Sequence, residues 1–251
     1  PSDAKLDLSK RALVASGAAG VGALLALRLT PQAQAKVFEP GLIRPPGARP
    51  ESEFLKRCVQ CGICMRACPT NGLHPTFLEA GLEGMWTPRL VPQLGYCEYE
   101  CNRCGQVCPT EAIEPKTVVE KQQIKLGLAT FDTSRCIPYA YERDCMICEE
   151  HCPLPKKAIF FVETDVTMRS GAAKRIKQPR VDADLCIGCG ICENKCVFRD
   201  RPAIRVTSAN ESRHAKNRPI LPLPAAPEGV PGAVPAPGAS PYASGGDPYG
   251  G

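Results

Sequence analysis

Cysteine spacing constrains this chain more than any other feature. The stretch CVQCGICMRACP, residues 58–69, places four cysteines at intervals of three, three and four residues and ends in proline. Three further groups of four cysteines follow, and together the four groups use all sixteen cysteines of the 251-residue chain. The groups are Cys58, Cys61, Cys64 and Cys68; Cys97, Cys101, Cys104 and Cys108; Cys136, Cys145, Cys148 and Cys152; and Cys186, Cys189, Cys192 and Cys196.

This spacing is typical of proteins that bind [4Fe-4S] clusters. In the run C-x2-C-x2-C-x3-C-P, three thiolates hold one cubane and the fourth reaches a neighbouring one. Small residues beside the cysteines, such as Gly62 and Gly188, allow the tight loops that such convergence needs. Structural zinc sites usually have two C-x2-C pairs, and disulfide frameworks are more extended than these triplets. The cysteines therefore predict four [4Fe-4S] clusters rather than zinc ions or disulfides.

The remaining composition fits a fold held together by its clusters. Aromatic residues make up 6% of the chain, which is little for a large hydrophobic core. We therefore expect cluster binding to supply much of the folding free energy between residues 50 and 207. The sequence has no nucleotide-binding glycine motif and no catalytic constellation, so we expect a subunit that is not catalytic by itself.

The N-terminal region contains an apolar segment, residues 12–29, that follows a basic flank at residues 1–11. Residues 33–35, AQA, resemble a signal cleavage site, so a secretory signal is one interpretation. As a helix of about 1.5 Å per residue, the segment also nearly matches the roughly 30 Å hydrocarbon core of a membrane. We favour a transmembrane anchor with its basic flank in the cytoplasm, which predicts cysteine groups on the periplasmic face of the cytoplasmic membrane. The prolines and glycines of residues 30–50 indicate an extended linker.

Short apolar segments flank the last two cysteine groups and predict strands. The order strand, cysteine group, hairpin, cysteine group, strand resembles that of a bacterial two-cluster ferredoxin. The predicted fold is α+β, with tandem two-[4Fe-4S] ferredoxin modules, small sheets and many loops. Residues 51–115 form a degenerate module without its first strand, and residues 116–207 form the second module. The expected strands are residues 128–132, 158–162, 180–182 and 203–207, and a short helix is expected near residues 76–82.

The ferredoxin resemblance also implies ligand sets, because the last cysteine of each group then serves the other cluster of its module. A nested pairing, group one with four and two with three, remains the alternative. An extra residue after Cys97, an insertion before Cys145 and Val197 in place of proline depart from the pattern. The implied sets are set I, Cys58, Cys61, Cys64 and Cys108; set II, Cys97, Cys101, Cys104 and Cys68; set III, Cys136, Cys145, Cys148 and Cys196; and set IV, Cys186, Cys189, Cys192 and Cys152.

Taken together, these features resemble the NapG/MauM type of periplasmic polyferredoxin. The matching residues are the four cysteine groups, residues 9–11 (SKR) and the segment from PTNGLHP to WTP, residues 69–88. The resemblance implies an electron-transfer subunit that relays single electrons between a membrane quinone or quinol partner and an extracytoplasmic oxidoreductase or cytochrome. Such proteins are associated with periplasmic nitrate reduction and methylamine oxidation. Some relatives carry a polytopic domain before this module, which leaves open a NapH-like fusion upstream.

Two other functions compete with the relay. One is an iron–sulfur assembly or structural subunit of a membrane redox complex, although complete ligand sets disfavour cluster donation. The other is a catalytic iron–sulfur enzyme, which needs an open iron site that the pattern does not show. The expected partners are membrane subunits of a quinone-linked complex and membrane lipid around residues 12–29, but no nucleic acid. The Pro/Gly-rich tail, residues 208–251, is expected to lie extended along a partner.

Overall fold

The computed structural model describes residues 15–23, 39–167 and 171–213. The chain divides into two compact units, Pro1–Pro40 and Gly41–Gly251. In the first unit, residues 15–23 are helical and exposed. No helix within the described ranges is long and apolar enough to cross a membrane. Both ends of the predicted anchor and nearly all of the predicted tail lie outside the described residues.

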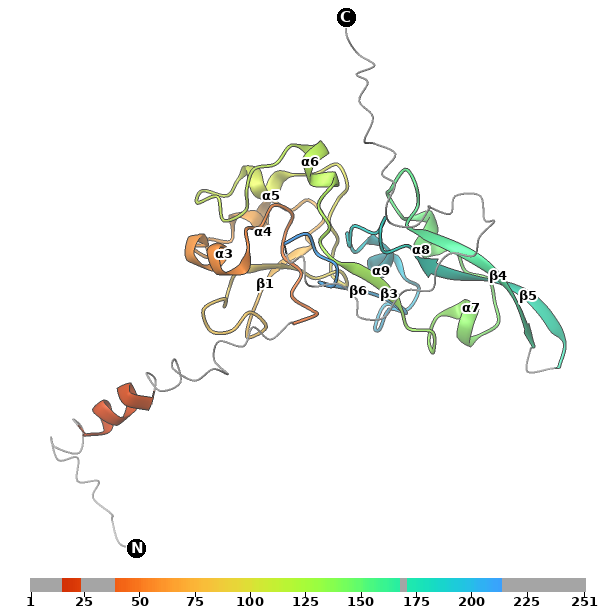
Figure 1. The fold of residues 1–251 in the computed structure, drawn as a ribbon, viewed down its shortest axis with the longest axis horizontal. Coiled ribbons are helices and arrows are strands. Elements are labelled where there is room, and N and C mark those ends of the chain that lie inside the picture. Colours follow the sequence, from red (N-terminus) through yellow and green to blue (C-terminus); the bar gives the residue numbers. More distant parts are fainter. Residues whose placement is uncertain (1–14, 24–38, 168–170, 214–251) are drawn as a thin grey trace, which may run out of the picture. The chain divides into compact units, whose positions relative to one another are not determined.

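The later part of the second unit is built around one antiparallel strand pair, β3 and β6 (Figure 1). Leu128 lies opposite Thr207 and Phe131 opposite Ile204, so the two ends of this module meet. A long hairpin, β4–β5, separates its two cysteine groups, in the order that the sequence predicts. The elements are β3 (Leu128–Phe131), α7 (Ile137–Ala140), α8 (Ile147–Glu150), β4 (Ile159–Thr167), β5 (Ala173–Val181), α9 (Ile191–Lys195) and β6 (Ile204–Thr207).

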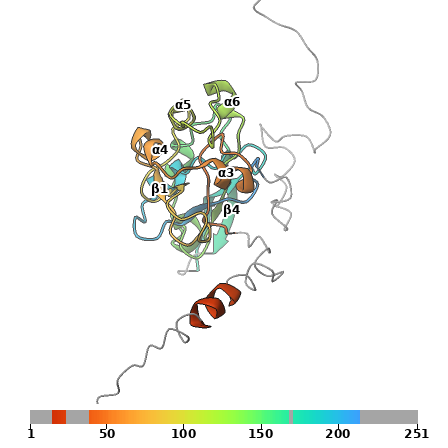
Figure 2. The ribbon, with the colours of Figure 1, turned by 90° about the vertical axis from the view of Figure 1, so that its left-hand side faces the viewer.

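The regular elements of the earlier part are mainly short helices, which Figure 2 shows facing the viewer. One small antiparallel sheet pairs β1 with β2, with His74 opposite Arg89. The elements are α3 (Glu51–Arg57), α4 (Ile63–Ala67), β1 (Leu73–Pro75), β2 (Pro88–Leu90), α5 (Arg103–Gln106) and α6 (Val118–Gln122).

The first module begins earlier than the sequence predicts. Residues 43–46 and Ala48 are buried, although they lie in the segment assigned to a linker. Ile43 bridges to Leu90 and Ala48 to Ile113, both antiparallel. This extended segment therefore occupies the place of the first strand, which the sequence predicts to be absent from residues 51–115. Its prolines cannot donate backbone hydrogen bonds, which keeps the pairing down to single bridges.

The connection between the first two cysteine groups also differs from expectation. Residues 79–86 form successive turns instead of a helix near residues 76–82. Buried Thr76 and Thr87 hold the base of this loop, with their hydroxyl oxygens 3.0 Å apart. Trp86 is 59% exposed, so the only tryptophan does not pack inside the fold.

One hydrophobic core runs through both modules. It includes Phe54, Leu90, Leu128 and Ile204, all at most 2% exposed, together with several cysteines. Each sheet described above has two strands, and two-stranded sheets are only marginally stable on their own. The fold therefore depends on packing between the cysteine loops. The cysteine sites are therefore part of the core.

Candidate iron-sulfur centres

The four cysteines of set I line one cavity. Buried Phe54 from α3 lies beside them, and Ala112 and Ile113 close the other side. Gly62 has φ +73° and caps α4, so the chain turns sharply between Cys61 and the helix that carries Cys64. A Cβ at Gly62 meets nothing within 4 Å, which means that the turn, and not the space, requires glycine.

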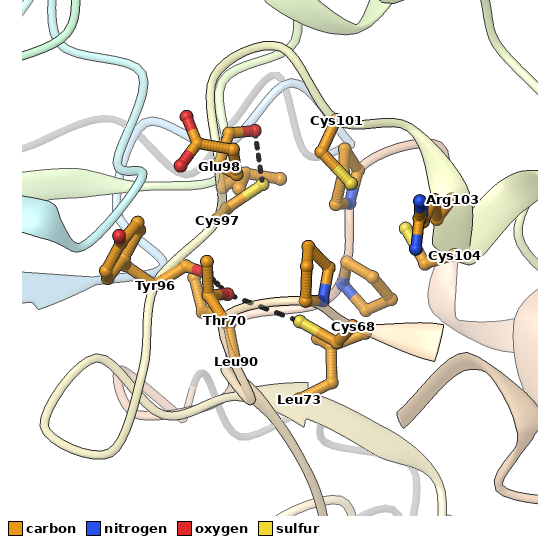
Figure 3. A pocket seen from close by; sticks show the side chains of 14 residues that line it. Cys68, Thr70, Leu73, Leu90, Tyr96, Cys97, Glu98, Cys101, Arg103 and Cys104 are labelled. Carbon is orange, nitrogen blue, oxygen red and sulfur yellow. Dashed lines mark hydrogen bonds between the residues drawn. The ribbon is translucent and has the colours of Figure 1, made fainter. Parts of the chain in front are cut away.

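The four cysteines of set II line a second cavity, shown in Figure 3. Cys97, Cys101 and Cys104 come from group two, and Cys68 reaches the cavity from group one. Their sulfurs surround a common space in Figure 3, with Leu73 and Leu90 among the apolar residues around it. The extra residue between Cys97 and Cys101 therefore leaves all three cysteines of group two at the same cavity.

The four cysteines of set IV line a third cavity. Cys186, Cys189 and Cys192 are buried, and Cys152 comes from the preceding group. Gly188 has φ +66°, and a Cβ there would lie 2.4 Å from the backbone nitrogen of Gly127. Both conformation and space thus exclude a side chain at this position.

The cysteines of set III line none of these three cavities, but they are close enough to affect one another electrostatically. Burial, followed by the thiolate charges of Cys145 and Cys196, raises the pKa of Cys136 to about 12. Burial and the charges of Cys136 and Cys145 likewise raise the pKa of Cys148 to about 12. The insertion before Cys145 forms α7 and packs against β5, where the Tyr139 hydroxyl donates a 2.8 Å hydrogen bond to the Pro179 carbonyl. This contact holds the insertion against the β4–β5 hairpin.

The structure thus brings group one together with group two, and group three together with group four. The nested arrangement would need cavities shared by groups one and four, and the cysteine-lined cavities described above combine groups differently. Within the described part of the chain, no three or more His, Cys, Asp or Glu side chains are placed to hold a metal ion. The thiolates of a cubane bind separate iron atoms and therefore lie farther apart than the ligands of one ion.

Backbone N–H groups point at the last cysteine of three groups. Gly72 donates to Cys68 Sγ at 3.3 Å, Ile113 to Cys108 Sγ at 3.5 Å, and Ala203 to Cys196 Sγ at 3.4 Å. Hydrogen bonds of this kind stabilise thiolates and the negative charge of a bound cluster.

Threonine hydroxyls also lie near these sulfurs in the first module. Thr70 Oγ1 lies 3.4 Å from Cys68 Sγ, and Thr110 Oγ1 lies 3.9 Å from Cys108 Sγ. Burial acts to raise the pKa of Cys108, but the hydrogen bonds from Ile113 and Thr110 outweigh it and the pKa is lowered. The repeated Cys-Pro-Thr at residues 68–70 and 108–110 is the sequence signal for these hydroxyls, and spacing analysis alone missed it.

The other thiols are mostly harder to ionise. Burial raises the pKa of Cys64, Cys104 and Cys189 to about 12 and that of Cys97 to about 11. A cysteine binds iron as a thiolate, so these buried thiols must lose protons when a cluster binds. Four converging sulfurs with few oxygen or nitrogen ligands nearby fit the chemistry of a [4Fe-4S] cluster.

Comparison with known proteins agrees with this chemistry. Residues 55–74 match the 4Fe-4S binding domain family. Ferredoxin-type protein NapG of Escherichia coli is 36% identical over 194 residues, which is 76% of this chain and 80% of that protein. Methylamine utilization ferredoxin-type protein MauM of Methylorubrum extorquens is 36% identical over 205 residues, 79% of this chain and 88% of that protein. The chain belongs to the NapG/MauM family of ferredoxin-type proteins.

Other members of the NapG/MauM family are similarly close. MauM of Paracoccus denitrificans is 37% identical over 170 residues, which is 65% of this chain and 70% of that protein. No solved structure matches the chain. Family membership confirms the resemblance read from the cysteine groups and supports an iron–sulfur protein of the electron-transfer class.

Proposed function

We propose that this NapG/MauM-type protein binds four [4Fe-4S] clusters, one at each of sets I to IV, and relays single electrons through them. The observation that carries the proposal is the convergence of four cysteines, three from one group and one from its neighbour, on one cavity at each of sets I, II and IV. The thiols of set III act on one another electrostatically, which supports a fourth site. Each bound cluster supplies a one-electron redox centre. The chain supplies the thiolates, N–H donors and buried surroundings that set its reduction potential.

The contacts between sets support a relay order that differs from sequence order. In the first module, α4 packs against α5, and the thiolate of Cys64 adds to the burial that raises the pKa of Cys104. In the second module, α8 packs against α9, and the thiolate of Cys148 adds to the burial that raises the pKa of Cys192. These contacts connect set I with set II and set III with set IV.

The connection between the modules runs from set II to set IV. The backbone N–H of Cys97 donates a 2.8 Å hydrogen bond to the carbonyl of Cys189. Ile187 and Ile191 pack beside these cysteines against Tyr96 and Tyr99. The proposed order is therefore I, II, IV, III, with sets I and III at the ends. Cys61 of set I is exposed, which suits an end that exchanges electrons with a partner.

The partners we propose are a membrane quinol-oxidising subunit and an extracytoplasmic oxidoreductase or cytochrome. The family resemblance supports this, since the matched relatives are ferredoxin-type proteins and MauM is named for methylamine utilization. We also propose that residues 12–29 attach the protein to the cytoplasmic membrane, with the clusters on the periplasmic side. The alternative, an assembly or structural subunit, is less well supported because each set has four cysteines and no open position for transfer.

A redox titration tests the relay. The full chain would be purified anaerobically with its membrane partners, and iron, sulfide and electron paramagnetic resonance signals would be measured with quinol as reductant. We expect four clusters that quinol reduces and an added oxidising partner reoxidises. Clusters that are present but inert to both would favour the structural alternative, and fewer than four clusters would refute the assignment of sets I to IV.

A further inference from the structure

A buried lysine lies at the junction between sets II and IV. Lys121, on α6, is 3% exposed. Its ammonium donates hydrogen bonds to the carbonyls of Glu98 and Tyr99, the latter at 3.0 Å, and lies 5.8 Å from the centre of the Tyr99 ring. The Glu98 carbonyl oxygen that accepts from Lys121 lies 3.9 Å from Cys97 Sγ, and the charge of Lys121 opposes the effect of burial on the pKa of Cys97. Two carbonyls thus accept from the ammonium group and hold it beside the loop that carries Cys97.

The charge of Lys121 lies beside the loop that carries Cys97 and is not paired with an acidic side chain. Among the residues that the structure describes, no carboxylate forms an ion pair with Lys121. Arg44 is different, because it lies near set I but is paired with Glu51. A cation without a counter-ion acts strongly across a buried, low-dielectric space.

Local structure holds Lys121 in place. Thr117 and Glu120 form a reciprocal capping box at the start of α6, with the Thr117 N–H donating to Glu120 at 2.7 Å. The backbone N–H of Lys121 donates to the Thr117 carbonyl at 3.0 Å. Because α6 is fixed at its start, the long side chain reaches inward to the loop of residues 97–99 with little freedom to move away.

We propose that Lys121 is a positioning residue that raises the reduction potential of the centre bound at set II. This inference rests on the proposed function. A reduced cluster carries one more negative charge than an oxidised one, so a fixed cation beside one of its thiolates stabilises the reduced form. Lys121 thereby makes set II a favoured electron position at the point where the relay passes from the first module to the second.

The test is a redox titration of the intact holoprotein carrying Lys121→Met, which keeps side-chain length but removes the charge. We expect unchanged iron content and one centre whose ratio of reduced to oxidised form, at fixed ambient potential, falls by about tenfold or more. The centre is identified by its altered resonance signal in Cys68→Ser. The matched control is Lys116→Met, which removes a lysine from the surface near the same helix and should change no centre.

Two further variants separate charge from structure. Lys121→Arg should restore the wild-type potential, whereas Lys121→Gln should lower it as Lys121→Met does. Intact iron content with wild-type potentials in both neutral variants would overturn the inference and leave the four-cluster relay standing. Loss of iron in both neutral variants, with full iron in Lys121→Arg, would make Lys121 a binding requirement of set II and would also overturn a tuning role. A wild-type protein without four reducible clusters would instead refute the proposed function itself.

Discussion

The backbone N–H of Cys97 donates a 2.8 Å hydrogen bond to the carbonyl oxygen of Cys189. This bond joins set II to set IV across the boundary between the modules. Nearby, Leu126, which lines the set II cavity, donates its N–H to the Ile187 carbonyl at 2.9 Å. The two modules therefore meet through the cysteine loops themselves, which gives the proposed relay a direct route between them.

Gly188→Ala is the first prediction, because Gly188 lies in this junction. The new Cβ would lie 2.4 Å from the Gly127 nitrogen, at a left-handed φ of +66°. Backbone strain and overpacking together should lower the free energy of unfolding by roughly 2–4 kcal/mol. Gly62→Ala is the control, since it also has positive φ but meets nothing within 4 Å. Equal iron retention and equal denaturation midpoints in the two variants would contradict the close approach at Gly188.

The ligand sets predict which substitutions affect the same centre. Cys68→Ser should alter the centre of set II although Cys68 lies in group one, and adding Cys97→Ser should affect no further centre. Cys68→Ser combined with Cys58→Ser should alter two centres. Resonance spectra and iron content of the three proteins distinguish these cases. The cross-group assignment fails if the Cys68 and Cys97 double variant alters two centres.

The sequence predicted the pairing of elements better than the boundaries of the modules. Cysteine spacing indicates cluster loops because the ligand geometry requires it, and flanking β-branched residues mark β3 to β6. The sequence predicts a linker over the segment 43–49 because the prolines and glycines of residues 30–50 exclude a regular helix. Burial of extended proline-rich backbone depends on the neighbours that cover it, here Leu90 and Ile113, and those neighbours are distant in sequence.

Individual polar residues at the sites were harder to predict. Lys121 lies in the polar run KTVVEKQQIK, residues 116–125, where one lysine has no periodic pattern to mark it as buried. Its position depends on the carbonyls of Glu98 and Tyr99, which only the folded loop of group two presents to it. Trp86 shows the opposite case, since a large aromatic residue lies exposed on a loop whose buried base is made by threonines.

Acid should weaken the contact that fixes the start of the first module. Arg44 is buried, lies 4.6 Å over the Phe54 ring and forms an ion pair with Glu51, which also pairs with Arg213. Burial acts to raise the pKa of Glu51, but the hydrogen bonds and charges of the two arginines outweigh it and lower the pKa below 4.5. A lowered pKa means that ionised Glu51 stabilises the fold above pH 4.5 and that this contribution is lost as pH falls through the folded value.

Glu51→Gln tests this pair. We expect a loss of roughly 2–4 kcal/mol at neutral pH, because Arg44 keeps a buried charge without its partner. The rate at which visible cluster absorbance disappears should then differ between wild type and variant at neutral pH and converge as pH falls below about 4.5. Glu53→Gln is the control, since Glu53 is 40% exposed and its ion pairs should contribute little. A constant difference across the whole pH range would exclude ionised Glu51 as the cause.

Removal of iron should unfold most of the second unit. The core includes Cys64, Cys104, Cys148 and Cys192, so the cluster sites occupy the positions that apolar side chains fill in other folds. Without iron, the small sheets lack the covalent connections that hold the loops together, and metal binding free energy is folding free energy. Anaerobic chelation should therefore abolish most of the circular dichroism, and retention of the native spectrum by an iron-free protein would show that packing alone suffices. In the unfolded apoprotein the cysteine thiols have ordinary pKa values of about 8.5, so at neutral pH they carry protons that iron must displace. Reconstitution with iron and sulfide should consequently become more favourable as pH rises from about 7 to 9, with protons released in proportion to the clusters formed.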